Sequence, residues 1–431
     1  MSATRCAGAN QLGSAMSEFI RRSSGRRRAI LLACVASTPL WVLPMPSAVA
    51  QEAEAGASDA RDVILVTARR REDDIFDVAS SVSVIGGQLA EDLRIDTIGE
   101  ALALAPNVVL NTNEFTGRVD PQIRGVPNPP NTVQFDPSVA VYRNGTYISG
   151  AGLRGGQLVD IERIEVLRGP QGGLYGRNSI GGVLNVVFAR PDFEESGFHV
   201  EAEASRYERY EAWASANFAL NDSLALRAVG WWTEQNDSET FNAARNEPLG
   251  GVEDKGARVI AAVRPALWWE ATTELEFNES SNTLRTDIGE VSQNAALLFG
   301  LGDSIERTLT LEEVLLNDPN LNEDERFFAS HESVFQTEYG DIIFTASYSD
   351  FEGFTSRDQD FTDADASASV GLFETVNSVA AESEDVFAEL RYASSEDRAL
   401  RFQAGLSYLS QDTVQDGAQP SRLDIPDPVE G

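Results

Sequence analysis

The stretch VLRGPQGGLYGRNSIGGVLNVV (Val166–Val187) packs six glycines and two arginines ahead of an apolar run that is typical of a β-strand. It contains neither the dinucleotide fingerprint G-x-G-x-x-G nor the Gly-Lys-Ser/Thr of a P-loop, so the glycines do not indicate a phosphate site. Glycine instead permits positive φ angles and close backbone approach. A tightly packed insert inside another structure requires both properties.

The side chains of this stretch refine that expectation. Arg168 and Arg177 can form bidentate pairs with carboxylates in partly buried places, which suits an insert that faces an acidic inner wall. We expect Gly173, Gly176 and Gly182 to lie at closely packed positions, where a β-branched residue would destabilise the insert.

The first fifty residues have the pattern of an export signal. Arg21–Arg28 is cationic, an apolar run follows, and Ala48-Val49-Ala50 is a small-x-small cleavage site. We interpret residues 1–50 as a signal peptide that removes Cys6 and Cys34, which leaves the mature chain without a thiol. An uncleaved membrane anchor and lipid attachment at Cys34 are the alternatives.

The charge balance argues against a non-specific nucleic-acid binder. The chain holds 34 basic and 68 acidic residues, and such proteins need a basic face to displace counterions from phosphate. Residues 193–431 alone hold 15 basic and 48 acidic residues, a charge that solvated loops tolerate better than a compact core. No run of 18 apolar residues follows the signal, so the exported chain is periplasmic, secreted or an outer-membrane barrel.

Residues 51–74 combine a tether and one strand-like segment. Gln51–Ala60 is small and acidic and is expected to be disordered. Val63–Thr67 is strongly β-prone and stands alone between this tether and a charged run. It is either the first strand of the next domain or a recognition peptide that adds itself to the sheet of another protein.

Residues 75–192 have the pattern of a compact α+β domain. The run ASSVSVI predicts a strand, and Thr97 with Glu100 predicts a capping box for a helix that Pro106 ends. Asn144-Gly145 stands between two strand-like runs and predicts a hairpin. A further strand, VDIERIEVLRG, leads into the glycine-rich stretch.

From residue 193 onward the hydrophobic period is two. Thr273, Leu275 and Phe277, for example, share one face, while Glu274 and Glu276 share the other. Such strands, expected to be about 8 to 11 residues long, can cross a bilayer when tilted. Trp231-Trp232 and Trp268-Trp269 are placed at strand ends, as in an aromatic girdle.

The connections between these strands alternate between short and long. Short links such as LNDS and EYGD take turns with long polar segments at about residues 236–254, 281–325 and 351–384. This asymmetry is typical of an antiparallel transmembrane β-barrel over residues 193–431, with a secreted β-sandwich as the alternative.

The order of these segments resembles the TonB-dependent outer-membrane receptors. The signal peptide, DVILVTARR, PQIRGV, the glycine-rich stretch and the barrel strands carry the resemblance. It implies an α+β plug domain followed by an antiparallel transmembrane β-barrel, with the plug in the lumen and the solute bound by plug tips and outer loops. It also implies that Asp62, Val63, Ile64, Leu65, Val66 and Thr67 form a TonB box. The plug signature and gating residues it implies are Arg124, Gly125, Arg168, Gly169, Gly172, Gly173, Tyr175, Gly176, Arg177, Gly181 and Gly182.

Two departures from the family pattern matter. Only Gln51–Arg61 precedes the expected TonB box, so an additional signalling domain is not expected. We count about nine strands, the last at residues 400–410 with a polar tail after it, whereas plugged barrels of this class use about 22. We therefore expect the chain to be the N-terminal part of a longer receptor, or a truncated product that cannot close a barrel.

No catalytic or metal constellation is evident. His199 and His331 are the only histidines, and their distance along the chain favours solvated positions over a metal site. No Ser/His/Asp grouping or cysteine cluster occurs, so we predict no enzyme activity and no cofactor.

The function that the resemblance implies is active uptake of a scarce solute, most often a ferric siderophore, across the outer membrane of a Gram-negative bacterium. The implied partners are TonB, outer-membrane lipid and a small ligand such as a ferric chelate, without nucleic acid. A non-transporting surface receptor or adhesin on the same scaffold, and a secreted sandwich enzyme, are the alternatives.

Overall fold

The computed structural model describes fourteen segments, all within one compact unit that spans residues 62–431. The expected signal peptide, the acidic tether and Asp62–Ile64 lie outside them. No described helix is both long enough and apolar enough to cross a membrane. The described segments are residues 65–67, 70–71, 73–75, 78, 80–112, 119–126, 137–148, 157–238, 240–242, 246–283, 313–314, 320–358, 376–395 and 400–418.

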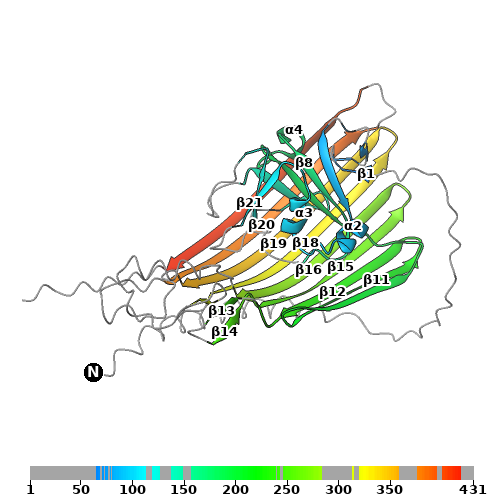
Figure 1. Ribbon diagram of the computed structural model, residues 1–431. Coiled ribbons are helices and arrows are strands. Elements are labelled where there is room, and N and C mark those ends of the chain that lie inside the picture. Colours follow the sequence, from blue (N-terminus) through cyan, green and yellow to red (C-terminus); the bar gives the residue numbers. More distant parts are fainter. Residues whose placement is uncertain are drawn as a thin grey trace, which may run out of the picture. The chain divides into compact units, whose positions relative to one another are not determined.

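In these segments, nine strands form one antiparallel sheet in which each strand pairs with the next member along the chain (Figure 1). The expected number of barrel strands and their antiparallel order are confirmed. The strands are β10 (Gly197–Ser205), β11 (Arg209–Asn221), β12 (Leu224–Gln235), β15 (Val252–Ala266), β16 (Trp269–Thr283), β18 (Leu321–Thr337), β19 (Gly340–Asp358), β20 (Val376–Ser394) and β21 (Gln403–Ala418).

The two faces of this sheet have the polarity of a membrane barrel. On β16, Leu275 and Phe277 are 49% and 44% exposed, while Glu274 and Glu276 are 2% and 7% exposed. An apolar outer face and a polar inner face are what a bilayer selects, because lipid replaces water on the outside only. The alternation of apolar and polar residues in the sequence therefore indicates the wall of a barrel and not a sheet that packs one face on a soluble core.

Strand length is where the expectation was wrong. Strands of 8 to 11 residues were expected, but β19 and β20 have 19 residues each. The last strand was expected at residues 400–410, but β21 runs from Gln403 to Ala418 and includes the whole polar run QDTVQDGA. Ladder hydrogen bonds join backbone groups whatever the side chains are, so the pairing continues beyond the apolar band.

Short and long connections alternate along the described strands, as expected. Two-residue turns join β11 to β12 at residues 222–223, β15 to β16 at residues 267–268, and β18 to β19 at residues 338–339. The connections at the other strand ends are longer, and two of them contribute to a small sheet of order β14-β13-β17. Its strands are β13 (Thr240–Asn242), β14 (Glu247–Leu249) and β17 (Glu313–Val314).

A second, five-stranded sheet lies in the described part of residues 81–188, in the order β3-β8-β9-β6-β7. Strands β6 and β9 are parallel, and the other neighbours are antiparallel. The predicted hairpin is confirmed, since Asn144 and Gly145 have φ angles of 48° and 77°, as a tight primed turn requires. The strands are β3 (Ser81–Gly86), β6 (Val139–Arg143), β7 (Thr146–Ile148), β8 (Ile161–Arg168) and β9 (Gly182–Phe188).

The predicted capping box is also present. Thr97 accepts a hydrogen bond from the Glu100 backbone N–H, and the Glu100 carboxylate accepts one from the Thr97 N–H. The helix it starts ends before Pro106, because the residue preceding proline disfavours helical backbone angles. The described helices are α2 (Gly87–Asp92), α3 (Ile98–Ala103) and α4 (Gly172–Tyr175).

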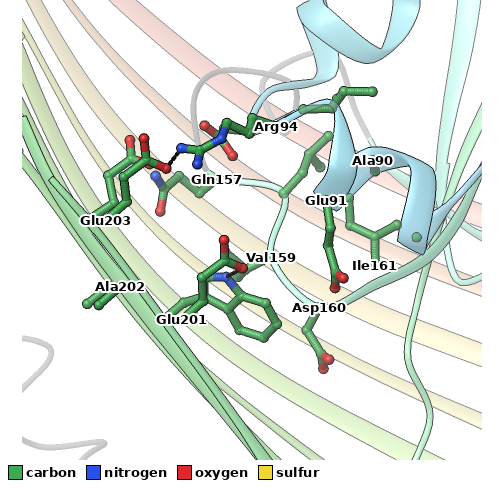
Figure 2. Close-up of a pocket in the computed structure, with 17 residues that line it drawn as sticks. Ala90, Glu91, Arg94, Gln157, Val159, Asp160, Ile161, Glu201, Ala202 and Glu203 are labelled. Atoms are coloured by element: carbon green, nitrogen blue, oxygen red, sulfur yellow. Dashed lines mark hydrogen bonds and ion pairs between the residues drawn. The ribbon is translucent and has the colours of Figure 1, made fainter. Parts of the chain in front are cut away.

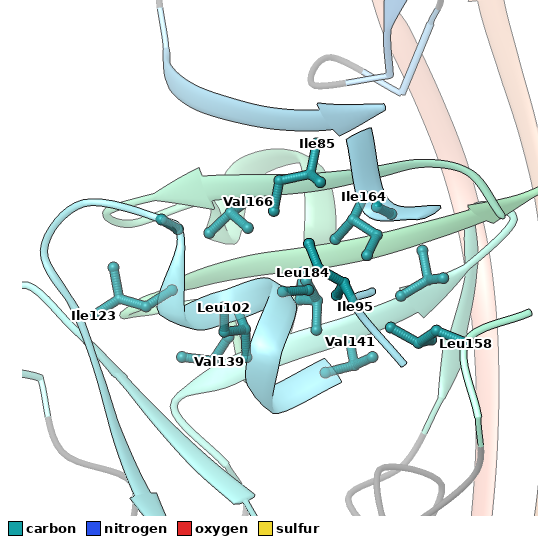
Figure 3. Packing of buried hydrophobic residues seen from close by; sticks show 14 of the residues in the cluster. Ile85, Ile95, Leu102, Ile123, Val139, Val141, Leu158, Ile164, Val166 and Leu184 are labelled. Carbon is teal, nitrogen blue, oxygen red and sulfur yellow. The ribbon is translucent and has the colours of Figure 1, made fainter. Parts of the chain in front are cut away.

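The five-stranded sheet is buried on both faces. On one face, Ile164, Leu184 and Val141 pack with the helical residues Ala90 and Leu102 (Figure 3). The alternate strand residues form a second cluster on the other face, which includes Phe387 of β20. Two short pairs flank the sheet: β1 (Leu65–Val66) with β2 (Asp73–Asp74), and β4 (Val108–Thr112) with β5 (Val119–Ile123).

Candidate functional site

The expected TonB box is described from Leu65 onward. Leu65 and Val66 form β1, which pairs with β2, and Val66 is fully buried in the second hydrophobic cluster. That cluster also contains Leu167 and Val183 of the five-stranded sheet and Phe387 of the barrel wall. This end of the segment is therefore docked between the two sheets and is not a free tail.

Thr67 is held by hydrogen bonds at each of its polar atoms. Its N–H donates to Glu165 Oε1 at 2.9 Å, and its hydroxyl donates to Glu165 Oε2 at 2.6 Å. Asn185 donates to the same hydroxyl, and the Tyr175 hydroxyl donates to the Thr67 carbonyl, both at 2.8 Å. Burial, with the charge of Glu165, raises the pKa of Tyr175 far above its ordinary value, so this hydroxyl keeps its proton.

Arg70 ties the same segment to the barrel wall. Its guanidinium lies 2.7 Å from the Glu389 carboxylate on β20, and both side chains are about nine-tenths buried. The guanidinium also lies over the rings of Tyr142 and Tyr175, at 5.5 and 5.8 Å from their centroids. A charge removed from water in this way is stable only while its partner stays in place.

Hydrogen bonds to backbone carbonyls also join this segment to the barrel wall. Arg391 Nη1 donates to the Arg70 carbonyl at 2.6 Å, and Arg71 Nη2 donates to the Ser394 carbonyl at 2.7 Å. Both partners belong to β20. Residues 65–71 thus contact the plug sheet through Thr67 and the wall through Arg70 and Arg71.

Arg124, in the plug motif PQIRGV, lies beside Gly169 of the glycine-rich stretch. Arg124 and Gly125 follow β5 with φ angles of 53° and 76°, and the Arg124 side chain is exposed. A Cβ atom on Gly169 would lie 2.8 Å from Arg124 Nη1, so glycine at position 169 lets the two motifs approach. Gly169 also has a φ angle of 96°, which other residues rarely adopt.

The structure places the two arginines of the opening stretch in different surroundings. The half-buried Arg168 donates to the Pro106 carbonyl at 3.3 Å, and the described residues show it no carboxylate partner. Arg177 is exposed, in the turn after α4. Outside the glycine-rich stretch, Arg143 and Arg227 each pair with carboxylates through more than one nitrogen.

The glycines of the opening stretch divide into two kinds. A Cβ on Gly182 would lie 2.4 Å from the Leu167 carbonyl oxygen, and one on Gly181 would lie 3.3 Å from the Ser138 carbonyl oxygen. Gly172 and Gly173, in α4, face open space, so the close packing expected at Gly173 is wrong. Gly176 ends α4 with a φ angle of 72° and also has open space around it, so it serves the turn and not close packing.

A buried charge cluster joins the plug to the wall, and sequence reasoning missed it. Arg143, at the end of β6, donates to Glu274 Oε1 at 2.9 Å and to Glu276 Oε1 at 2.7 Å, both on β16. Arg258 of β15 donates to Glu276 Oε2 at 2.8 Å and stacks on Phe188 of the plug, with 3.6 Å from its guanidinium carbon to the ring centroid. Two cations and two carboxylates therefore neutralise one another away from water.

The plug side of this cluster stays charged. Burial alone would lower the pKa of Arg143, but the charges of Glu274 and Glu276 outweigh it and raise this pKa above its ordinary value. The only signals in the sequence were inward charges on predicted strands and an arginine directly before the Asn144-Gly145 turn. Neither signal predicts a partner 131 residues away.

A pocket lies between α2 with its following loop and strands β10 and β11 (Figure 2). Its lining is acidic, and Arg94 is paired with Glu203 across it. Burial and the charges of Glu211 and Glu100 raise the pKa of Asp96 to about 6, against a weaker opposing effect of Arg209 at 4.0 Å. Within the described residues no three His, Cys, Asp or Glu side chains are placed to hold a metal ion.

Comparison with known proteins agrees with this architecture. The sequence signature of the TonB-dependent Receptor Plug Domain matches residues 74–183. The chain is 29% identical to the vitamin B12 transporter BtuB of Photobacterium profundum, over 52% of this chain and 36% of the relative. It is 27% identical to the iron-regulated outer membrane virulence protein of Vibrio cholerae, over 60% of this chain and 39% of the relative.

The fold is also that of a solved receptor. The crystal structure of the ferric yersiniabactin uptake receptor FyuA from Yersinia pestis superposes with a TM-score of 0.66 at 17% identity, over 79% of this chain and 50% of that one. The chain thus spans about half the length of that structure and less than half of the two sequence relatives. Residues 74–183 thus belong to the TonB-dependent receptor plug family, and the described chain has the fold of the N-terminal half of a TonB-dependent receptor.

Proposed function

We propose that this chain carries the plug and the first barrel strands of a receptor that takes up a scarce solute across the outer membrane, with energy delivered through TonB. The observation that carries the proposal is the docking of residues 65–71. This short segment contacts the plug through Thr67 and the wall through Arg70, so a pull on it would act on both.

The chemistry of the segment suits a partner that adds a strand. Asp62–Thr67 is β-prone, and among its described residues Leu65 and Val66 pair with β2. A partner sheet that pairs with more of the segment would gain main-chain hydrogen bonds that β2 does not provide. We therefore assign Asp62–Thr67 as the TonB-binding site.

The solute class follows from the relatives. One relative is named as a vitamin B12 transporter, another as iron-regulated, and the structural neighbour as a ferric yersiniabactin uptake receptor. A ferric chelate is accordingly the proposed solute. The proposed organisation is a signal peptide (1–50), a tether with TonB box (51–74), a plug (75–192) and barrel strands (193–431), in which the signature residues Arg124 and Gly169 fix the plug loops.

The test is energised uptake of radiolabelled ferric chelates by cells that produce this chain as part of a complete receptor. Proline at Ile64 removes a backbone donor from the segment, so it should abolish uptake and leave cell-surface binding and outer-membrane level unchanged. Ala57→Pro, in the acidic tether, is the matched control and should take up the chelate normally. Normal uptake by Ile64→Pro, or uptake in cells without TonB, would refute the proposal.

A further inference from the structure

The inner face of β16 changes character along the strand. Glu274 and Glu276, toward its start, hold the plug residue Arg143. Residues 278, 280 and 282 follow on the same face, because side chains alternate in a strand. The inner face of β16 therefore has two parts. Glu274 and Glu276 contact the plug, and residues 278, 280 and 282 lie beyond the contact with Arg143.

Within the residues that the structure describes, this second part carries oxygen atoms that have no hydrogen-bond partner. They are Asn278 Oδ1, Ser280 Oγ and Asn282 Oδ1, all buried from water. Asn278 and Ser280 are 2% and 7% exposed. Buried acceptors are normally paired, so three consecutive unpaired oxygens on one strand face call for a functional explanation.

Several polar groups on the neighbouring strands pair with one another. Asp254, opposite Ser280 on β15, accepts from Trp231 at 2.7 Å and from Asn278 at 3.2 Å. On β18 and β19, Thr355 donates to Asn322 at 2.7 Å.

The charges nearby favour an uncharged ligand. Arg326 of β18 lies opposite Asn278 and interacts electrostatically with Asp324, Glu276 and Asp254. This buried guanidinium would repel a metal ion, and the acidic neighbours would repel an anionic chelate. Amide and hydroxyl oxygens without net charge match neutral O–H or N–H donors.

We infer that Asn278, Ser280 and Asn282 bind an uncharged solute that presents O–H or N–H donors along β16. The inference rests on the proposed uptake function and restricts its solute to neutral, donor-rich chelates. Side chains two residues apart on a strand are separated by about 7 Å, so the ligand must offer donors at that spacing. Each donor would relieve an acceptor that folding leaves unpaired.

Binding is measured by calorimetry on the purified chain in detergent. The probes are ferrichrome, an uncharged ferric hydroxamate with peptide N–H donors, and ferric enterobactin, an anionic ferric catecholate. Ferrichrome should bind and ferric enterobactin should not. Ser280→Ala and Asn282→Leu should each weaken ferrichrome binding by about tenfold, because each removes one acceptor. Ser281→Ala, on the outer face of the same strand, is the control and should bind like the parent.

A second readout does not depend on the choice of probe. Removing an unpaired buried oxygen relieves a cost of folding, so Ser280→Ala should raise the unfolding temperature by about 2 °C. A lower unfolding temperature would show that the hydroxyl has a structural partner, and would overturn the inference. So would absent ferrichrome binding, or equal ferrichrome affinity in parent and variants.

Failure of this inference and failure of the proposed function give different results. If TonB-dependent iron uptake persists while ferrichrome does not bind, the inference alone is wrong. If ferrichrome binds with the expected variant pattern while uptake does not require residues 62–67, the proposed function is wrong and the binding site stands.

Discussion

The Arg70 guanidinium lies 2.7 Å from the Glu389 carboxylate, and this pair joins two residues that are 319 positions apart. One residue belongs to the segment that follows β1, and the other belongs to wall strand β20. Because both side chains are largely buried, the pair can break only if the segment leaves the wall or one charge stays unpaired in a dry site. The pair therefore holds the segment on the wall.

Glu389→Gln should loosen this segment. Losing one partner of a buried ion pair costs on the order of 3 kcal/mol, since the remaining charge has no equal partner. We expect faster trypsin cleavage after Arg70 and Arg71 in the purified chain. Glu382→Gln, on the exposed side of the same strand, is the control and should be cleaved like the parent. An unchanged cleavage rate in Glu389→Gln would show that the pair does not hold the segment.

Tyr175→Phe tests the contact with Thr67. The substitution removes a single hydroxyl that donates to the Thr67 carbonyl, at a cost of about 1 kcal/mol. Hydrogen exchange at the amides of residues 65–67 should accelerate by about fivefold. Tyr392→Phe removes a hydroxyl bonded to the Tyr339 carbonyl, and it should leave those amides unchanged. Equal exchange in Tyr175→Phe and the parent would argue against the contact.

Gly182 and Gly173 should respond oppositely to alanine. A Cβ at position 182 would meet the Leu167 carbonyl oxygen at 2.4 Å and Ile123 Cδ1 at 2.8 Å, so β8 and β9 would have to separate. Overpacking of this kind costs about 1–3 kcal/mol, and Gly182→Ala should lower the unfolding temperature. Gly173 faces open space inside a helix, where alanine is favoured, so Gly173→Ala should be neutral or stabilising. A larger loss in Gly173→Ala would contradict this packing.

Stability should fall as Asp96 ionises. The folded pKa of Asp96 is about 6, above its ordinary value near 4, so the folded chain binds more protons than the unfolded chain between these two pH values. Stability from this group is therefore greatest below pH 4 and is lost as the pH rises through 6. The effect should be modest, because the side chain is 39% exposed to screening solvent.

Asp96→Asn isolates that contribution. The variant should unfold at a higher temperature than the parent at pH 7.5 and at the same temperature at pH 4. A variant that is less stable at both pH values would mean that the carboxylate makes a favourable contact with Arg209 that outweighs burial and the neighbouring carboxylates.

Much of the fold could be predicted because it depends on local patterns. Thr97 with Glu100 starts a helix and Asn144-Gly145 turns a hairpin, since both act over a few residues. Strand alternation identified the wall because lipid fixes the polarity of one face throughout. The strand ends could not be predicted in the same way, because β21 continues where its neighbour β20 offers backbone partners and not where its side chains are apolar.

The site was less predictable, because its contacts join distant parts of the chain. The sequence predicted a TonB box at Asp62–Thr67 and the plug motifs, but it did not predict that Thr67 docks on Glu165 or that Arg143 pairs with Glu274 and Glu276. Such pairs depend on which plug strand faces which wall strand. That relation follows from the packing of two sheets and has no local signal.

The proposed binding of TonB to Asp62–Thr67 requires Leu65–Thr67 to leave the site where they are docked. The most direct measurement is the affinity of the purified chain for the periplasmic domain of TonB. Glu389→Gln, which loosens docking, should bind at least as tightly as the parent, and Ile64→Pro should lose binding while it keeps the thermal stability of the parent. Equal affinity in the parent and Ile64→Pro would contradict the account, since the partner would then be recognised elsewhere on the chain.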